Sequence, residues 1–233
     1  MIRIYDDIDA LSKAAAEIFA EEAVKAVNLK GYFTVLLAGG ETPGRTYELL
    51  SQEPYRSAIP WENVYFFWGD ERCVPFNDPR NNAFTAHKIL INKIPISEDH
   101  VYIIESELKP SEAADDYGST LLNFFHTGTP VFDLVFLGLG EDGHTASLFP
   151  GKVDYPEDRY VVVTRKAGED ICRISLTPSI INLAAKTLFL VSGKNKASVL
   201  NEVQNGPYNP LKLPAQLIKP SIWLVDNAAS GKF

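Results

Sequence analysis

The amino-acid sequence predicts a three-layer α/β fold, in which a mostly parallel β-sheet is covered by helices on both faces. Short apolar runs, typical of buried strands, alternate along the chain with longer segments whose apolar residues recur at helical spacing. Several of the runs end in glycines, which allow the backbone to leave a strand sharply. Strands that alternate with helices form parallel sheets covered on both sides. Since no shift in composition marks a linker, we expect a single domain over residues 1–233.

The expected elements follow in a regular order. Helices are expected over residues 7–29, 43–50, 82–90, 111–125, from 178 onward, and 193–203. Strands are expected over residues 34–38, 64–68, 133–139, 160–164, 174–176, 187–191 and 222–225. Asn81 or Asn82 can cap the helix that follows it, and one more helix is expected to begin beside Asp142 and His144.

The glycine turn at residues 39–43 is suited to hold an anion. Glycines allow close approach of the backbone, and a helix N-terminus offers unpaired N–H groups with partial positive charge. We expect Thr42 to be the N-cap and Pro43 the first helical residue. The turn matches neither a Walker loop nor a dinucleotide motif, and an ordinary capped turn is an equal alternative. The candidate anion-binding residues here are Gly39, Gly40, Thr42 and Arg45.

Residues 132–150, FDLVFLGLGEDGHTASLFP, hold the main candidates for catalysis. In an open α/β sheet, ligands bind just beyond the carboxyl ends of the strands, and Asp142 and His144 follow such an end. His144 is the one of the four histidines that follows a glycine turn, and imidazole titrates near neutral pH. The alternative is that Asp142 only caps a helix and His144 is a surface histidine.

Three strands with glycine at their exits, near residues 39, 69 and 138, are expected to share one pocket at one edge of the sheet. The net charge is −8, so an anionic substrate must be held by a few local cations. Arg72 suits this role because a guanidinium binds an oxyanion through two nitrogens, although its Asp-Glu-Arg triplet is also typical of a solvated loop. Arg173 and Lys196 are the other candidates, and a lysine at a helix start opposes the helix dipole unless an anion binds there.

Composition argues against several classes of protein. An acidic chain is unsuited to nucleic acid or to an anionic membrane surface. No apolar segment reaches the roughly 20 residues of a membrane span, and the N-terminus lacks the pattern of a signal peptide. Cys73 and Cys172 lack the spacing of a zinc site or a disulfide framework. We therefore expect a cytoplasmic protein, a monomer or weak homo-oligomer, with no metal or cofactor.

Six segments, taken in order, resemble the 6-phosphogluconolactonase family. They are AGGETPGRTYELL at 38–50, WGDERCVP at 68–75, GLGEDGHTASLFPG at 138–151, RISLTPSIIN at 173–182, GKNKASVL at 193–200 and PAQLIKPSIWLVDNAA at 214–229. Glu41, where the family often has serine, and residues 77–82 depart from its pattern. The resemblance implies a Rossmann-like fold of the sugar-phosphate isomerase/deaminase type. It also implies hydrolysis of 6-phospho-D-glucono-1,5-lactone to 6-phospho-D-gluconate in the oxidative pentose phosphate pathway, without a metal.

Lactone hydrolysis needs a base for water, donors for a tetrahedral oxyanion, and a proton for the leaving ring oxygen. His144 can supply the base and return the proton, with Asp142 orienting its ring. Backbone N–H groups in the range from Gly140 to Gly143 are the expected oxyanion donors. No GxSxG segment suggests a serine nucleophile.

The sequence leaves two alternatives to a lactonase. A glucosamine-6-phosphate deaminase or isomerase would need a further acid or base, and a glutamate that closely follows the Asp-Gly-His element in those enzymes is absent here. A non-catalytic sugar-phosphate sensor would usually carry a DNA-binding region, for which the acidic helix at 7–29 is too short.

Overall fold

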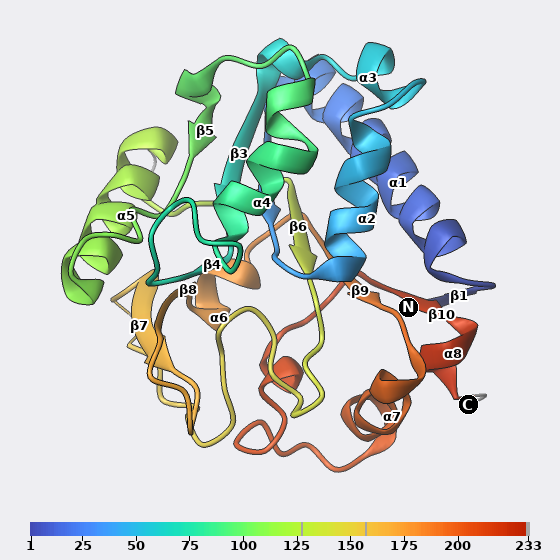
Figure 1. Cartoon of the computed structure of the whole chain (residues 1–233), viewed down its shortest axis with the longest axis vertical. Coiled ribbons are helices and arrows are strands. Elements are labelled where there is room, and N and C mark those ends of the chain that lie inside the picture. The colour runs from blue at the N-terminus through green and yellow to red at the C-terminus, as the bar shows by residue number, and fades with distance from the viewer. Residues whose placement is uncertain (127, 157, 232–233) are drawn as a thin grey trace.

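The computed structural model describes residues 1–126, 128–156 and 158–231, and its main feature is a seven-stranded parallel sheet (Figure 1). The strand order is β1-β10-β9-β6-β2-β3-β5. The strands are β1 (Ile2–Tyr5), β2 (Phe33–Leu37), β3 (Val64–Trp68), β5 (Val101–Tyr102), β6 (Leu134–Leu137), β9 (Lys186–Val191) and β10 (Ile222–Asp226). A second, antiparallel sheet has the order β4-β8-β7, with β4 (Asp70–Arg72), β7 (Val161–Arg165) and β8 (Cys172–Leu176).

Helices connect most of the strands of the large sheet. They are α1 (Ile8–Lys30), α2 (Glu41–Leu50), α3 (Tyr55–Ala58), α4 (Asn82–Ile89), α5 (Pro110–Phe125), α6 (Pro178–Ile181), α7 (Ala197–Asn205) and α8 (Asn227–Ser230). Short 3₁₀ segments are η1 (Trp61–Asn63), η2 (Ile91–Lys93), η3 (Glu98–His100), η4 (Lys194–Lys196) and η5 (Pro214–Leu217). In the described part of the chain, no helix combines the length and the apolar character that crossing a membrane requires.

Two consecutive phenylalanines of β3 show that the sheet is covered on both faces. Successive strand side chains point to opposite faces. Phe66 stacks on Phe19 of α1 with ring centroids 6.3 Å apart, whereas Phe67 meets Phe124 of α5 edge-on at 5.1 Å. All of the strand residues of β2, β6 and β10 are buried, which requires cover on both sides. The expected three-layer α/β fold is therefore confirmed.

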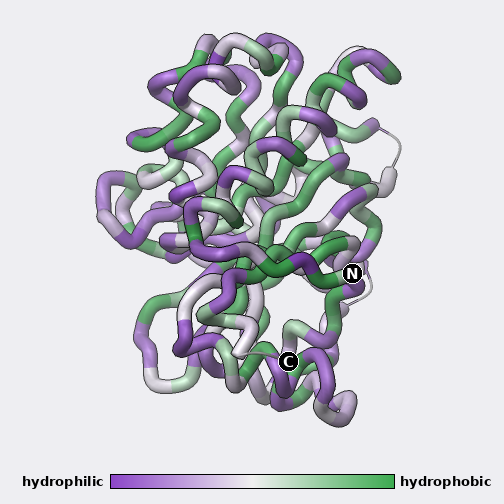
Figure 2. The backbone as a smooth tube through the Cα atoms, turned by 90° about the vertical axis from the view of Figure 1, so that its right-hand side faces the viewer, coloured by the Kyte–Doolittle hydropathy of each residue, from purple (hydrophilic) through white to green (hydrophobic). Residues whose placement is uncertain are grey.

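The carboxyl ends of the central strands point toward the half of the molecule that holds the small sheet and α7 (Figure 1). Strands β9, β6, β2 and β3 are neighbours, so their exit loops meet at one place. Along the backbone, hydrophobic segments run through the interior and hydrophilic segments lie mainly in the outer loops and turns (Figure 2). The sheet thus collects four loops at one edge, which are the three predicted strand exits after β2, β3 and β6 and a fourth exit after β9.

Most of the expected helices and strands are observed within a few residues of their predicted ends. The first helix begins after Asp7, whose side chain accepts a hydrogen bond from the Ala10 N–H at 2.8 Å, and ends at Gly31 in the left-handed conformation. Asn81 caps α4 by accepting a hydrogen bond from the Phe84 N–H, also at 2.8 Å. Both caps match the side-chain chemistry that places Asp and Asn at helix starts.

The helix expected beside Asp142 and His144 is absent, and that expectation was wrong. The chain instead forms successive turns, with a bridge between Thr145 and Leu148. Ala146 between them has a φ of 46°, which interrupts a right-handed helix. The Thr145 hydroxyl donates to the Gly138 carbonyl at 2.8 Å, so the segment folds back on its own strand.

The start of α2 also differs from the expectation. The N-cap is Gly40, with a φ of 108° and no capping side chain, and Glu41 is the first helical residue. Thr42, expected to be the N-cap, therefore lies inside the first turn. Glycine explains the difference, because it adopts this positive φ without steric cost and lets the helix begin earlier.

Three short strands were not expected from the sequence: β1, β4 and β5. Strands β1 and β5 lie at the two edges of the large sheet and are only partly buried, so their apolar signal is weak. Strand β4 is the Asp-Glu-Arg triplet, which pairs antiparallel with β8. This pairing brings two cysteines that are distant in the sequence together, with the Cys73 N–H donating to the Cys172 carbonyl at 2.9 Å.

Glu71, in the middle of β4, joins the small sheet to α4. Its side chain is fully buried and accepts hydrogen bonds from the N–H groups of Asn82, Ala83 and Arg72, each at 2.8 Å. Burial raises the pKa of this carboxyl to about 7, although the three N–H donors favour the charged form. Glu71 therefore sets the position of β4 relative to the start of α4.

We predict that Glu71→Ala lowers the free energy of unfolding by roughly 3–5 kcal/mol, because it leaves three N–H donors without an acceptor in the interior. Urea denaturation of the purified variant measures this loss. The matched control is Glu112→Ala, since the Glu112 side chain is 54% exposed and forms an exposed ion pair with Lys109. That control should change stability by about 0.5 kcal/mol or less. Equal losses in the two variants would contradict the role given to Glu71.

Candidate active site

A cavity of about 570 Å³ lies at the carboxyl edge of the large sheet. Loops that follow β2, β3, β6 and β9 line it, together with β8 of the small sheet. Its polar and glycine lining residues are Gly39, Gly40, Glu41, Thr42, Asp70, Arg72, Asn82, Gly138, Gly140, His144, Arg173, Ser192, Gly193, Asn195 and Lys196. The structure thus joins three glycine-bearing strand exits in one cavity, as predicted, and adds a fourth loop after β9.

His144 reaches the cavity with its ring fixed by Asp142. The Asp142 Oδ1 atom accepts a very short hydrogen bond from His144 Nδ1 and another from the His144 backbone N–H at 3.1 Å. Burial raises the pKa of Asp142, but the hydrogen bond and charge of His144 outweigh it, so the net pKa is lowered. A carboxylate can only accept, so Nδ1 is the donor in this bond, and in a neutral imidazole the lone pair then lies on Nε2. An imidazole oriented in this way is suited to accept a proton at Nε2.

Gly140 provides the space in which the imidazole lies. A Cβ atom at this position would be 2.0 Å from His144 Nδ1 and 2.8 Å from Asp142 Oδ1. Gly143 is constrained as well, since its φ is 80° and an added Cβ would meet Leu213 at 2.6 Å. Only glycine satisfies both positions.

The N–H groups of Gly140 and Gly143 are engaged within the turn itself. The Gly140 N–H donates to the His144 carbonyl at 2.8 Å, and the Gly143 N–H donates to the Gly140 carbonyl at 3.0 Å. Both bonds close the turn that carries Asp142 and His144. An oxyanion in this cavity must therefore be bound by donors other than these two N–H groups.

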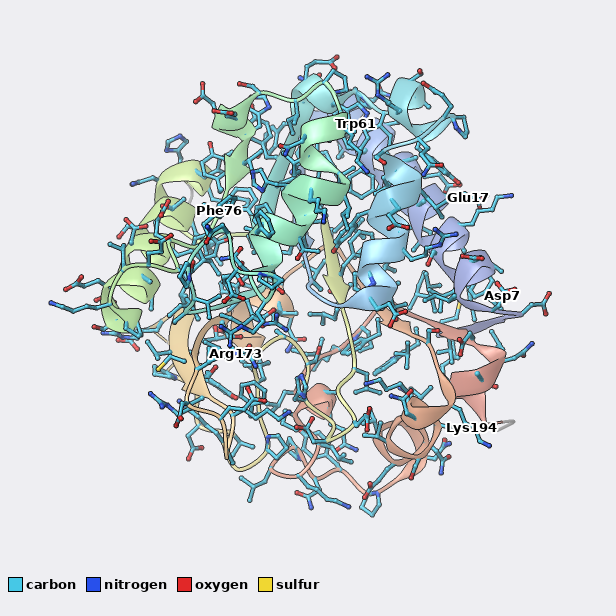
Figure 3. All side chains as sticks on the ribbon, viewed as in Figure 1. Asp7, Glu17, Trp61, Phe76, Arg173 and Lys194 are labelled. Carbon is cyan, nitrogen blue, oxygen red and sulfur yellow. The ribbon has the colours of Figure 1, made fainter. Side chains whose placement is uncertain are left out.

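Arg72 and Arg173 are direct partners across β4 and β8, and both side chains line the cavity. Within the described residues, their Nε atoms are buried without a hydrogen-bond partner. Like charges placed opposite each other on a sheet repel, so an anion between the two guanidinium groups would be stabilised. Figure 3 shows Arg173 at the small sheet, below the carboxyl ends of the large-sheet strands. Two neighbouring guanidinium groups with free donors are suited to bind a phosphate or carboxylate.

The start of α2 and Lys196 approach the same cavity. Gly40 and Thr42 line it, and in the described part of the chain no side chain caps this helix, so its first N–H groups remain free to bind an anion. Gly39 allows close packing, because a Cβ there would lie 1.9 Å from the Asn82 side-chain oxygen. Two sources of positive potential therefore face the arginine pair.

Arg45, the remaining sequence candidate, lies elsewhere. Its Nε atom is 2.7 Å from Asp9 Oδ1, and its Nη1 atom is 2.9 Å from Glu48 Oε2. It lines a neighbouring cavity of about 620 Å³ that does not include His144. Lys194 is also exposed and lies near α7 at the edge of the molecule, outside the cavity lining (Figure 3).

Five polar lining residues were not among the predicted site residues: Glu41, Asp70, Asn82, Ser192 and Asn195. Asp70 is buried and accepts a hydrogen bond from the Ser147 hydroxyl. Asn195 donates to Glu141 Oε1 at 2.6 Å, which links the loop after β9 to the Asp-Gly-His turn. The position of Asp70 beside Arg72 was a usable signal, whereas the Asn195 contact depends on tertiary structure.

Among the residues that the structure describes, no three His, Cys, Asp or Glu side chains are grouped closely enough to hold a metal ion. The cavity lining offers an imidazole, two arginines, a lysine, the carboxylates of Glu41 and Asp70, and a helix N-terminus as its chemical groups. Such a set can activate water and hold an anionic substrate.

Comparison with known proteins agrees with this picture. The family model described as glucosamine-6-phosphate isomerases/6-phosphogluconolactonase matches residues 6–225. A 6-phosphogluconolactonase of Haemophilus influenzae is 34% identical over 92% of this chain and 94% of its own length. One from Synechocystis is 37% identical over 88% of this chain and 86% of its own. The solved structure of 6-phosphogluconolactonase from Trypanosoma brucei superposes with a TM-score of 0.86 at 26% identity, covering 100% and 98% of the two chains.

The family match spans the cavity and all the loops that line it. With its fold and its cavity at the carboxyl edge of the sheet, the chain belongs to the glucosamine-6-phosphate isomerase/6-phosphogluconolactonase family.

Proposed function

We propose that this protein hydrolyses 6-phospho-D-glucono-1,5-lactone to 6-phospho-D-gluconate, with His144 as the general base. The observation that carries the proposal is the Asp142–His144 pair at the wall of a cavity that also holds two arginines with unused donors. The relatives from Haemophilus influenzae and Synechocystis are named 6-phosphogluconolactonases, which favours this member of the family over a deaminase.

The reaction follows from the geometry of the pair. His144 Nε2 accepts a proton from water, and the water oxygen forms a bond to the lactone carbonyl carbon. The carbon–oxygen bond to the ring oxygen then breaks, and that oxygen takes the proton back from His144. Asp142 stays ionised because its pKa is lowered, and it stabilises the imidazolium between the two steps.

The oxyanion and the phosphate require separate donors. We assign the phosphate to Arg72 and Arg173, whose Nε atoms are unpartnered. The N–H groups of Gly140 and Gly143 are engaged in the turn, so we assign the oxyanion to Lys196 and the free N–H groups at the start of α2.

We also propose that the enzyme is a single domain over 1–233 and acts in the cytoplasm as a monomer or weak homo-oligomer, without nucleic acid. The net charge of −8 supports the last point, because nucleic-acid surfaces are basic. Size-exclusion chromatography with light scattering measures the oligomeric state. A stable tetramer would contradict the proposed monomer or weak homo-oligomer.

His144→Asn should lower kcat by about 10²–10⁴-fold, the usual contribution of general acid–base catalysis. The assay generates the lactone from glucose 6-phosphate and follows its disappearance, with a no-enzyme blank because these lactones also hydrolyse spontaneously. His100→Asn is the matched control, since His100 is outside the cavity lining. Wild-type turnover in the folded His144 variant would remove it from the mechanism, and release of ammonia from glucosamine 6-phosphate by the wild type would favour the deaminase.

Arg72→Ala and Arg173→Ala should each raise KM strongly for the phosphorylated lactone, because a lost contact to a buried anion costs on the order of 2–5 kcal/mol. The same variants should change kcat/KM much less for unphosphorylated gluconolactone, which has no phosphate to bind. Measuring kcat/KM with both substrates therefore tests whether the two arginines bind the phosphate. Equal losses would show that the arginines serve the fold or the reacting carbonyl.

A further inference from the structure

A chain of ion pairs runs from the proposed base to the proposed phosphate site through the turn between β7 and β8. Asp142 Oδ2 lies 3.9 Å from Lys166 Nζ, and Lys166 Nζ lies 3.4 Å from Glu169 Oε1. Glu169 Oε2 in turn lies 2.7 Å from Arg173 Nη2. Positive and negative groups thus alternate from the imidazole of His144 to the guanidinium of Arg173.

Both carboxylates in this chain divide their oxygens between two partners. Asp142 presents Oδ1 to His144 and Oδ2 to Lys166. Glu169 presents Oε1 to Lys166 and Oε2 to Arg173, and these contacts lower the pKa of Glu169, so it is ionised near neutral pH. A carboxylate held at both oxygens has a fixed orientation, which a single contact does not provide.

The two middle residues lie outside the cavity. Neither Lys166 nor Glu169 lines it, and each side chain is 37% exposed. They therefore act on substrate only through Asp142 and Arg173. A surface pair of this kind contributes little to stability, so its place between two functional groups calls for another explanation.

We propose that Lys166 and Glu169 are positioning residues that couple the Asp142–His144 base to Arg173. The inference rests on the proposed function and deepens it by adding two residues that have no contact with substrate. Lys166 keeps Oδ1 of Asp142 directed at the imidazole and places a positive charge behind the pair. Glu169 offsets that charge and aims the guanidinium of Arg173 into the cavity.

The two charges should have opposite effects on the base. A cation near an imidazole disfavours its protonated form, so loss of Lys166 makes protonation easier, and the active neutral form is then lost at a higher pH. Loss of Glu169 removes the negative charge that offsets Lys166. Protonation of the imidazole then becomes harder, and its neutral form is lost only at a lower pH. Although Glu169→Gln removes the partner of Arg173, both variants keep the other charged side chains at the pair and the cavity: Glu41, Asp70, Arg72, Glu141, Arg173 and Lys196.

The test is the pH profile of kcat/KM for the phosphorylated lactone, corrected for spontaneous hydrolysis. Lys166→Gln should move the acidic limb to higher pH by roughly 0.3–1 unit, the effect of one partly exposed charge a few ångströms away. Lys166→Arg should restore the wild-type profile. Glu169→Gln should move the limb to lower pH and also raise KM, because Arg173 loses its partner.

The matched control is Lys109→Gln, which breaks a Lys–Glu pair of the same i,i+3 spacing at 3.2 Å and leaves the cavity untouched. It should keep the wild-type profile. The comparison uses Lys166 and Glu169 variants that keep the wild-type melting temperature. The coupling would be overturned if the acidic limb of their pH profiles did not move, or if it moved in the same direction in both. Failure of the proposed function is a separate result, since it would appear as full activity in His144→Asn.

Discussion

The missing side chain at Gly140 is the constraint on which the rest of the site depends. An added Cβ would occupy the place of His144 Nδ1, so the imidazole can lie against Asp142 only because position 140 is empty. The turn is then closed by the two glycine N–H groups, which fixes the backbone that carries both side chains. An imidazole held in this way needs no reorganisation to act as the base that we propose.

The sheet supplies the other half of the arrangement. Because β9, β6, β2 and β3 are parallel neighbours, their exit loops meet at one edge without any long connection. The small antiparallel sheet lies at that edge, and its β4–β8 pairing places Arg72 beside Arg173. In a chain of net charge −8, this is how cations are concentrated where an anionic substrate must bind.

The sequence predicted the parts of the fold that depend on strong local signals. The strand over 64–68 is a continuous apolar and aromatic run, and its observed bounds are the same. The edge strands β1 and β5 were missed because they are short and half exposed. The helix expected beside His144 was wrong, because Thr145 bonds back to Gly138, and that contact has no local signature.

In the site, too, local sequence signals mark some residues, whereas tertiary contacts place the others. Asp142, His144, Arg72 and Arg173 could be singled out because glycines or strand ends mark their positions. Arg45 was predicted to join them because it lies one turn into the helix that follows the glycine turn. In the structure it forms ion pairs with Asp9 and Glu48, outside the cavity lining. Glu71, Lys166 and Glu169 could not be predicted, since their partners are set by the pairing of β4, β7 and β8.

The most direct test is to compare turnover in Gly140→Ala and Gly118→Ala. The added methyl at position 140 must displace the imidazole, whereas position 118 lies in α5, outside the cavity lining, and a methyl there would meet Val161 at an ordinary 3.9 Å. We predict that Gly140→Ala loses about as much kcat as removal of His144, on the order of 10²–10⁴-fold, while Gly118→Ala keeps most of its activity. Similar activity in the two variants would contradict the claim that this glycine fixes the catalytic histidine.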